Sequence, residues 1–171
     1  MGRFAMLMVA VLVGPLLVAP AAQAGESKEQ AQLAEALKDT KVSLEKGLAA
    51  AAREGKPISA KFEIGDDGKL QLSIYTAKDD KFSEVIVDHQ TGQVAKVDPI
   101  TGGEDLAAAK SQAEAMAKAN LSLENAVFQV VYADRRYRAV SVYPSLRNGR
   151  AVADVTLHRG SEWRTVSEKL N

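Results

Sequence analysis

The apolar positions of the chain first follow a helical period. Residues 27–39 carry Leu33, Ala36 and Leu37 on one face, which predicts a helix. Ser43 is expected to cap a second helix, because its hydroxyl can accept a hydrogen bond from a free backbone N–H of the first turn. Gly55, expected in the left-handed conformation just past the helix end, is followed by Pro57, and together they predict the stop.

After Pro57 the apolar positions alternate with polar ones, which is the period of a half-buried strand. This pattern predicts strands at residues 58–64, 69–77, 82–87 and 93–97. Asp88 and Gly92 are expected to shape the turn after the third strand, with Thr91 between them. Asp can bind its own turn backbone, and Gly supplies positive φ.

The pattern then occurs a second time. Residues 34–45 read AEALKDTKVSLE and residues 113–124 read AEAMAKANLSLE, at an offset of 79 residues. The sequence therefore predicts one unit at 25–99, a linker at 100–103 and a second unit at 104–171. The second unit has Ser122 as its cap, Gly149 in its hairpin turn and predicted strands at 137–143, 151–157 and 163–166. No fourth strand is expected before Asn171.

Each unit thus reads helix, helix, then an antiparallel meander, which predicts an α+β fold. We expect the helices to pack on one face of each sheet. Two such small cores would gain by packing together, either as two sheets or as one sheet continued across both units.

The first 24 residues read as a secretory signal peptide. Arg3 precedes an apolar stretch, and Ala22-Gln23-Ala24 fits a small-x-small cleavage site, with the cut after Ala24. This predicts a periplasmic or secreted protein with no stable membrane anchor after cleavage. The chain has no Cys, so disulfides cannot hold the fold together.

Charge patterning points to contact surfaces in the second unit. The whole chain has 22 basic and 22 acidic side chains, a balance that does not favour nucleic acid. Arg and aromatic side chains dominate binding hot spots. The more usual explanation of such Arg residues is that they are solvated strand faces or attract the first unit, and Trp163 is expected to take the place of Phe82 in the core. The candidate partner-binding residues are Arg135, Arg136, Arg138, Tyr143 and Trp163.

No reactive centre is recognisable in the sequence. The two histidines, His89 and His158, lie outside any zinc-binding spacing, and no Gly-x-Ser-x-Gly elbow is present. The acidic pairs 66–67 and 79–80 lie at opposite ends of one predicted strand, about 30 Å apart, and cannot share an ion. We expect no enzyme activity, no catalytic residue, no metal and no cofactor.

The first unit resembles the PepSY domain family. The resemblance rests on the helix start at Ser43, Leu44, Glu45, Leu48 and Ala51, and on the later Val87, Asp88, Thr91, Gly92 and Val94. The second unit lacks the Asp-x-x-Thr-Gly turn and resembles a degenerate copy. The family resemblance implies a non-catalytic module that binds another protein and restrains or regulates a peptidase. The alternative is an accessory sensor domain that binds a small ligand or a metal ion.

Overall fold

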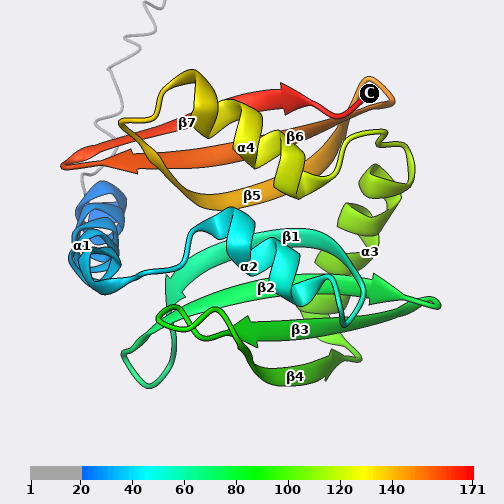
Figure 1. Ribbon diagram of the computed structural model, residues 1–171, viewed down its shortest axis with the longest axis horizontal. Helices are drawn as coiled ribbons and strands as arrows, with labels where there is room; N and C mark the ends of the chain where they lie inside the picture. The colour runs from blue at the N-terminus through cyan, green and yellow to red at the C-terminus, as the bar shows by residue number, and fades with distance from the viewer. Residues whose placement is uncertain (1–20) are drawn as a thin grey trace, which may run out of the picture.

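The computed structural model describes residues 21–171 (Figure 1). Most of the predicted signal peptide, residues 1–20, lies outside the described residues. Ala22–Ala24, at the predicted cleavage site, fall in the first turns of helix α1 (Ala21–Ala36), and the 3₁₀ turn η1 (Leu37–Asp39) follows. No helix in the described part of the chain is both long and apolar enough to span a bilayer.

Seven strands form a single antiparallel sheet in the order β4-β3-β2-β1-β5-β6-β7 (Figure 1). The α+β class is therefore confirmed, and one continuous sheet replaces the alternative of two separate ones. The strands are β1 (Lys56–Ile64), β2 (Leu70–Lys78), β3 (Lys81–Val87), β4 (Val94–Ile100), β5 (Arg138–Arg147), β6 (Arg150–Arg159) and β7 (Glu162–Lys169).

The two halves of the sheet meet between β1 and β5. Ala60 lies opposite Val142 and Lys61 lies opposite Ser141. Ala60 and Val142 also hold the same position in their own halves, because Ala60 pairs with Ile74 of β2 and Val142 pairs with Val155 of β6. An approximate two-fold axis therefore passes between Ala60 and Val142.

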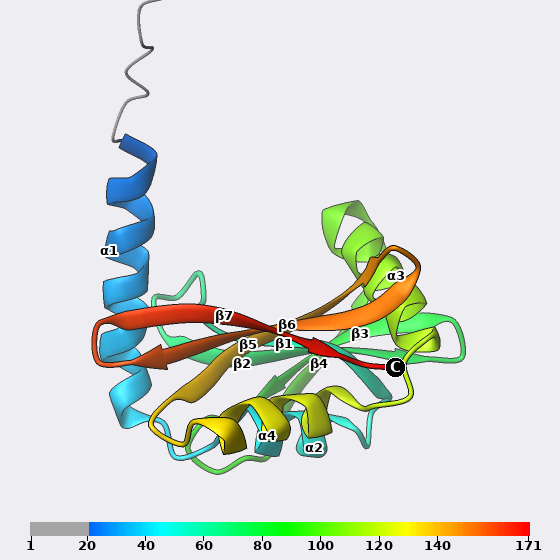
Figure 2. The ribbon, with the colours of Figure 1, turned by 90° about the horizontal axis from the view of Figure 1, so that it is seen from above.

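The sequence pattern led us to expect all helices on one face of the sheet, and this expectation was wrong. Helices α2 (Leu44–Ala51) and α4 (Leu123–Ala133) pack side by side on one face, whereas α3 (Gly103–Ala117) lies on the other and α1 stands across one end (Figure 2). The face under α3 is polar. Ser59 donates to Gln112 at 2.8 Å and Tyr75 donates to Asp105 at 2.8 Å, so polar side chains hold α3 in addition to its buried Ala109 and Met116.

The core lies between the sheet and the pair α2 and α4. Both helices are amphipathic and bury Leu44, Leu48, Leu123 and Val127 against the strands. Strands β2 and β6 supply fully buried partners such as Ile74 and Val155 from the other side. Burial of this apolar surface stabilises the sheet, at roughly 25 cal/mol per Å².

The starts of α2 and α4 are held by matching hydrogen bonds. The N–H groups of Lys41 and Val42 donate to the His89 carbonyl at 3.0 and 3.2 Å. The N–H groups of Asn120 and Leu121 donate to the Leu170 carbonyl at 2.7 and 3.0 Å. Directly after each pair comes the capping serine: Ser43 accepts from the Lys46 N–H at 3.3 Å and Ser122 accepts from the Asn125 N–H at 3.2 Å.

The turns after the strands also use the predicted residues. Asp88 accepts from the N–H groups of Gln90 and Thr91 at 2.8 and 2.7 Å, and these bonds hold the pKa of its carboxyl below the usual value. Thr91 accepts from the Gln93 N–H at 3.3 Å. Gly92 and Gly149 both have φ of 76°.

Two local expectations were wrong. Gly55 does not have positive φ; it is needed because a Cβ there would lie 2.9 Å from the Ala77 carbonyl oxygen. Strand β4 runs to Ile100 rather than ending at residue 97, so it includes Pro99 and the first residue of the predicted linker. Strand β4 is an edge strand, where a residue without an N–H is tolerated.

Candidate functional site

Two aromatic side chains on α4 are exposed to an unusual degree. Phe128 and Tyr132 are 58% and 59% exposed, the highest values among the large apolar side chains of the described residues. Their rings lie 5.7 Å apart, and the Arg135 guanidinium lies 4.4 Å from the centre of the Tyr132 ring. We call Phe128, Tyr132 and Arg135 the α4 stripe. Phe128 and Tyr132 are four residues apart and lie on one face of α4, and Arg135 follows in the turn after the helix.

The fold does not require these aromatic rings. The two helices start with equivalent caps, Ser43 and Ser122. Counting from these caps, Ala49 of α2 and Arg53, in the turn after α2, correspond to Phe128 and Tyr132 of α4. Ala49 and Arg53 are both exposed, so the fold accepts a small or a charged side chain at these places. The two exposed rings therefore do not stabilise the fold, and exposed apolar groups of this kind are typical of a binding surface.

A charged cluster continues from the end of α4 to β7. Arg136 donates from Nε and Nη2 to the two carboxylate oxygens of Asp134 at 2.9 and 2.8 Å. These side-chain hydrogen bonds lower the pKa of Asp134 to about 2. Arg164 lies 3.5 Å from the same carboxylate and 4.1 Å from the Tyr137 ring. The cluster thus presents three cationic or aromatic groups next to the α4 stripe.

The predicted contact residues do not form one site. Arg135 belongs to the α4 stripe and Arg136 to the adjoining cluster, but Arg138 turns inward. Its Nη1 donates to the Leu37 carbonyl at 2.7 Å, and its guanidinium lies 5.6 Å from the Phe62 ring. Burial lowers the pKa of the Arg138 guanidinium.

Tyr143 lies on the opposite, polar face of the sheet. It is 39% exposed and borders a cavity of about 160 Å³ beneath α3, together with Lys61 and Gln112. Burial raises the pKa of the Tyr143 phenol. The polar groups around it are already paired within the protein, since Ser59 binds Gln112 and Lys61 pairs with Glu63.

Trp163 faces α1 across a groove. Its ring centre is 4.4 Å from that of His158, and both side chains line a groove of about 490 Å³ with Ala34 and Lys38. His158 is 8% exposed and its Nε2 lies 2.8 Å from the Gly160 carbonyl oxygen. Trp163 pairs with His158 as Phe82 pairs with Ala77, which favours the packing role for this side chain.

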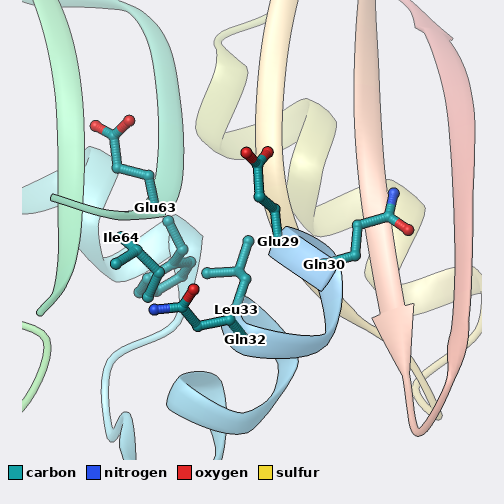
Figure 3. Close-up of a pocket in the computed structure, with 7 residues that line it drawn as sticks. Glu29, Gln30, Gln32, Leu33, Glu63 and Ile64 are labelled. Atoms are coloured by element: carbon teal, nitrogen blue, oxygen red, sulfur yellow. The ribbon is translucent and has the colours of Figure 1, made fainter. Parts of the chain in front are cut away.

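A groove of about 560 Å³ separates α1 from the end of β1. Figure 3 shows the Glu29 and Glu63 side chains pointing the same way, with Leu33 between α1 and Ile64. Glu63 is already bound by Lys61 and by the Gln71 amide, at 3.3 Å for the latter. Among the described side chains, those of residues 28–171, no group of three His, Asp or Glu is arranged to hold a metal ion.

Phe128 and Tyr132 were missed by our reading of the sequence. They lie off the apolar stripe of α4, which is formed by Leu123, Val127 and Val130. An aromatic pair four residues apart on the polar side of an amphipathic helix is the signal that would have found them.

Comparisons with known proteins leave the family open. No protein-family model matches the chain, and no match was found among curated proteins or solved structures. The PepSY resemblance therefore stays a prediction from the sequence.

Proposed function

We propose that this chain is an exported, non-catalytic protein that binds another protein through the α4 stripe. The single observation that carries the proposal is the stacked, exposed Phe128–Tyr132–Arg135 arrangement. Aromatic and Arg side chains that become buried at the centre of an interface supply most of its binding free energy. The adjoining Asp134–Arg136 pair provides a polar rim.

The resemblance to the PepSY family extends the proposal. The chain would be a tandem PepSY-like pair, with the second unit carrying the contact surface. A peptidase of the cell envelope is then the first partner to test, and binding would restrain or regulate it. The predicted export signal places protein and partner in the same compartment.

Co-purification of the tagged protein from its own cell envelope tests the proposal. We expect one partner to be captured by the wild type and lost when Phe128 or Tyr132 is replaced by Ala, because truncating a hot-spot residue costs about 2 kcal/mol or more of binding free energy. The matched control is Arg53→Ala, in the turn after α2 at the position that corresponds to Tyr132, which should keep the partner. Equal capture by Tyr132→Ala and Arg53→Ala would contradict the assignment of the site.

A small-ligand sensor is the second candidate, and the α1 groove is the observation that favours it. Its volume of about 560 Å³ lies in the range of small-molecule sites, and its lining combines Leu33 and Ile64 with the Glu29 carboxylate. Such a lining suits an amphipathic cation. A thermal-shift panel of organic amines and divalent cations tests it. No shift in the wild type, or a shift that persists in Glu29→Gln, would exclude this groove.

A further inference from the structure

Strand β7 presents an open edge of the sheet. In the described part of the chain it pairs with β6 alone, whereas β4 covers the equivalent edge of β3. The Leu170 N–H donates to the Ala151 carbonyl at 3.0 Å, which fixes the direction of the even-numbered backbone groups toward β6. The alternation of an antiparallel strand turns the other set outward. These outward residues are Trp163, Thr165, Ser167 and Lys169.

The opposite edge of the sheet is protected. Strand β4 contains Pro99, which has no N–H to offer to another strand. Strand β7 has no proline, runs for eight residues and carries exposed Thr165, Ser167 and Lys169. Unpaired N–H and C=O groups of this kind form a template for a further strand.

We propose that β7 pairs antiparallel with β7 of a second copy of this chain, about a two-fold axis at Val166. In this register Thr165 lies opposite Ser167 of the second copy, and Trp163 lies opposite Lys169. These are the residues whose backbone groups point outward, so all of them find partners. The result is one sheet that continues through both copies. This inference is independent of the proposed function.

Side-chain chemistry selects this register. Arg164 lies opposite Glu168 of the second copy, and symmetry forms this pair twice, on either side of a Val166–Val166 contact. Opposite charges facing each other across strands stabilise the pairing. Moving the axis by one residue, to Thr165, shifts the pairing by two residues; Glu162 would then lie opposite Glu168, and Arg164 opposite Val166. The register at Val166 is therefore favoured over its neighbour.

Arg164 has donors available for the new pair. Its side chain is 43% exposed, and the contact with Asp134 uses Nη2 at 3.5 Å. A guanidinium has five N–H donors, so Arg164 can hold Asp134 and a second carboxylate together.

The two-fold axis stands perpendicular to the sheet and leaves both helical layers on the same face. The dimer therefore presents two α4 stripes side by side to a partner, which raises avidity.

A single cysteine tests the contact directly, because the protein has none of its own. Val166→Cys places two thiols opposite each other, in an antiparallel position where Cα atoms lie about 4.5 Å apart, within the reach of a disulfide. The matched control is Val97→Cys on β4 at the other edge, where Val97 is 41% exposed. Under mild oxidation of the full chain we expect Val166→Cys to form the covalent dimer about ten times faster or more. Equal rates would overturn the proposal.

Charge reversal provides the second readout, by light scattering over a concentration series. We expect a wild-type dimer, about a tenfold weaker dimer for Arg164→Glu, and recovery in the double variant Arg164→Glu with Glu168→Arg. Lys96→Glu, a charge reversal on β4, should leave the dimer unchanged. Thr165→Pro removes an outward N–H without breaking a bond to β6. We expect this variant to be a monomer by light scattering and to be folded by circular dichroism. A wild-type monomer at every concentration, or a dimer insensitive to these changes, would refute the pairing at Val166.

Discussion

The Arg138 guanidinium donates from Nη1 to the Leu37 carbonyl at 2.7 Å, and this bond ties the second half of the chain to the first. Its counterpart runs the other way: the Lys56 ammonium donates to the Met116 carbonyl at 2.8 Å. The two donors begin the central strands, Lys56 in β1 and Arg138 in β5. The two acceptors have similar places in the halves: Leu37 directly follows α1, and Met116 lies in the last turn of α3. The two bonds are related by the axis between Ala60 and Val142. Each half thus supplies a cation to the other.

Arg138 should be important for stability rather than for binding. Replacing it with Ala removes the donor from the Leu37 carbonyl and the contact with Phe62, so we expect the free energy of unfolding to fall by about 1–3 kcal/mol. Lys56 is exposed, and Lys56→Ala should cost less than about 1 kcal/mol. Urea unfolding measures both changes. Arg53→Ala is the control and should stay within about 0.5 kcal/mol of the wild type. A loss of partner capture without loss of stability in Arg138→Ala would contradict this role.

The sequence pattern was sufficient for the elements whose signals are local. Helix caps at Ser43 and Ser122 and the hairpin turn at Gly149 depend on neighbouring residues, and they form where the pattern predicts them. The side of the sheet on which α3 lies could not be read in this way. Its position depends on Gln112 and Asp105 meeting Ser59 and Tyr75, which are distant in sequence.

The candidate site was only partly predictable for the same reason. Arg135 was identified by its residue type, but the inward turn of Arg138 depends on Leu37, a residue 101 positions away. The junction of the two halves of the sheet is equally non-local, because nothing near Ala60 or Val142 in the sequence specifies the other strand. A side chain can bind a partner only if it is exposed in the folded protein. Which side chains of α4 are exposed depends on how α2 and α4 pack on the sheet.

Gly47 and Leu72 form a size-matched pair. A Cβ on Gly47 would lie 2.4 Å from Cδ2 of the fully buried Leu72. The equivalent positions in the other half are Ala126 and Ala153, where a larger helix residue meets a smaller strand residue. We expect Gly47→Ala to lower the free energy of unfolding by about 1 kcal/mol, because overpacking outweighs the better helix propensity of Ala.

The same substitution should change sign when Leu72 is already Ala. Without the clash only the helix propensity remains, so Gly47→Ala should then raise the free energy of unfolding by up to about 1 kcal/mol. Denaturant unfolding of the four proteins completes a double-mutant cycle. Additive effects would show that Gly47 and Leu72 do not limit each other.

The two capping serines should contribute similarly. Each hydroxyl accepts one N–H of the first helical turn, at 3.3 Å for Ser43 and 3.2 Å for Ser122. We expect Ser43→Ala and Ser122→Ala each to cost about 1 kcal/mol of unfolding free energy, whereas Ser→Asp at either site should be nearly neutral because Asp also caps. Calorimetry of the four single variants checks this. An equal loss in the Asp variants would mean that the hydroxyl acts by packing rather than by capping.

Asp134 should make stability depend on acid pH. Hydrogen bonds from Arg136 lower its folded pKa to about 2, below the unfolded value. Its contribution is therefore complete above about pH 4 and is lost as the pH falls through about 2, because the unfolded state binds the proton first. Melting temperatures of wild type and Asp134→Asn should differ at pH 7 and converge at low pH. Arg136→Leu should also lower the melting temperature at pH 7. In the Arg136→Leu protein, Asp134→Asn should lower it less than in the wild type, because Asp134 then has Arg164 as its remaining cationic neighbour. A constant difference across this pH range would rule out ionisation of Asp134 as the cause.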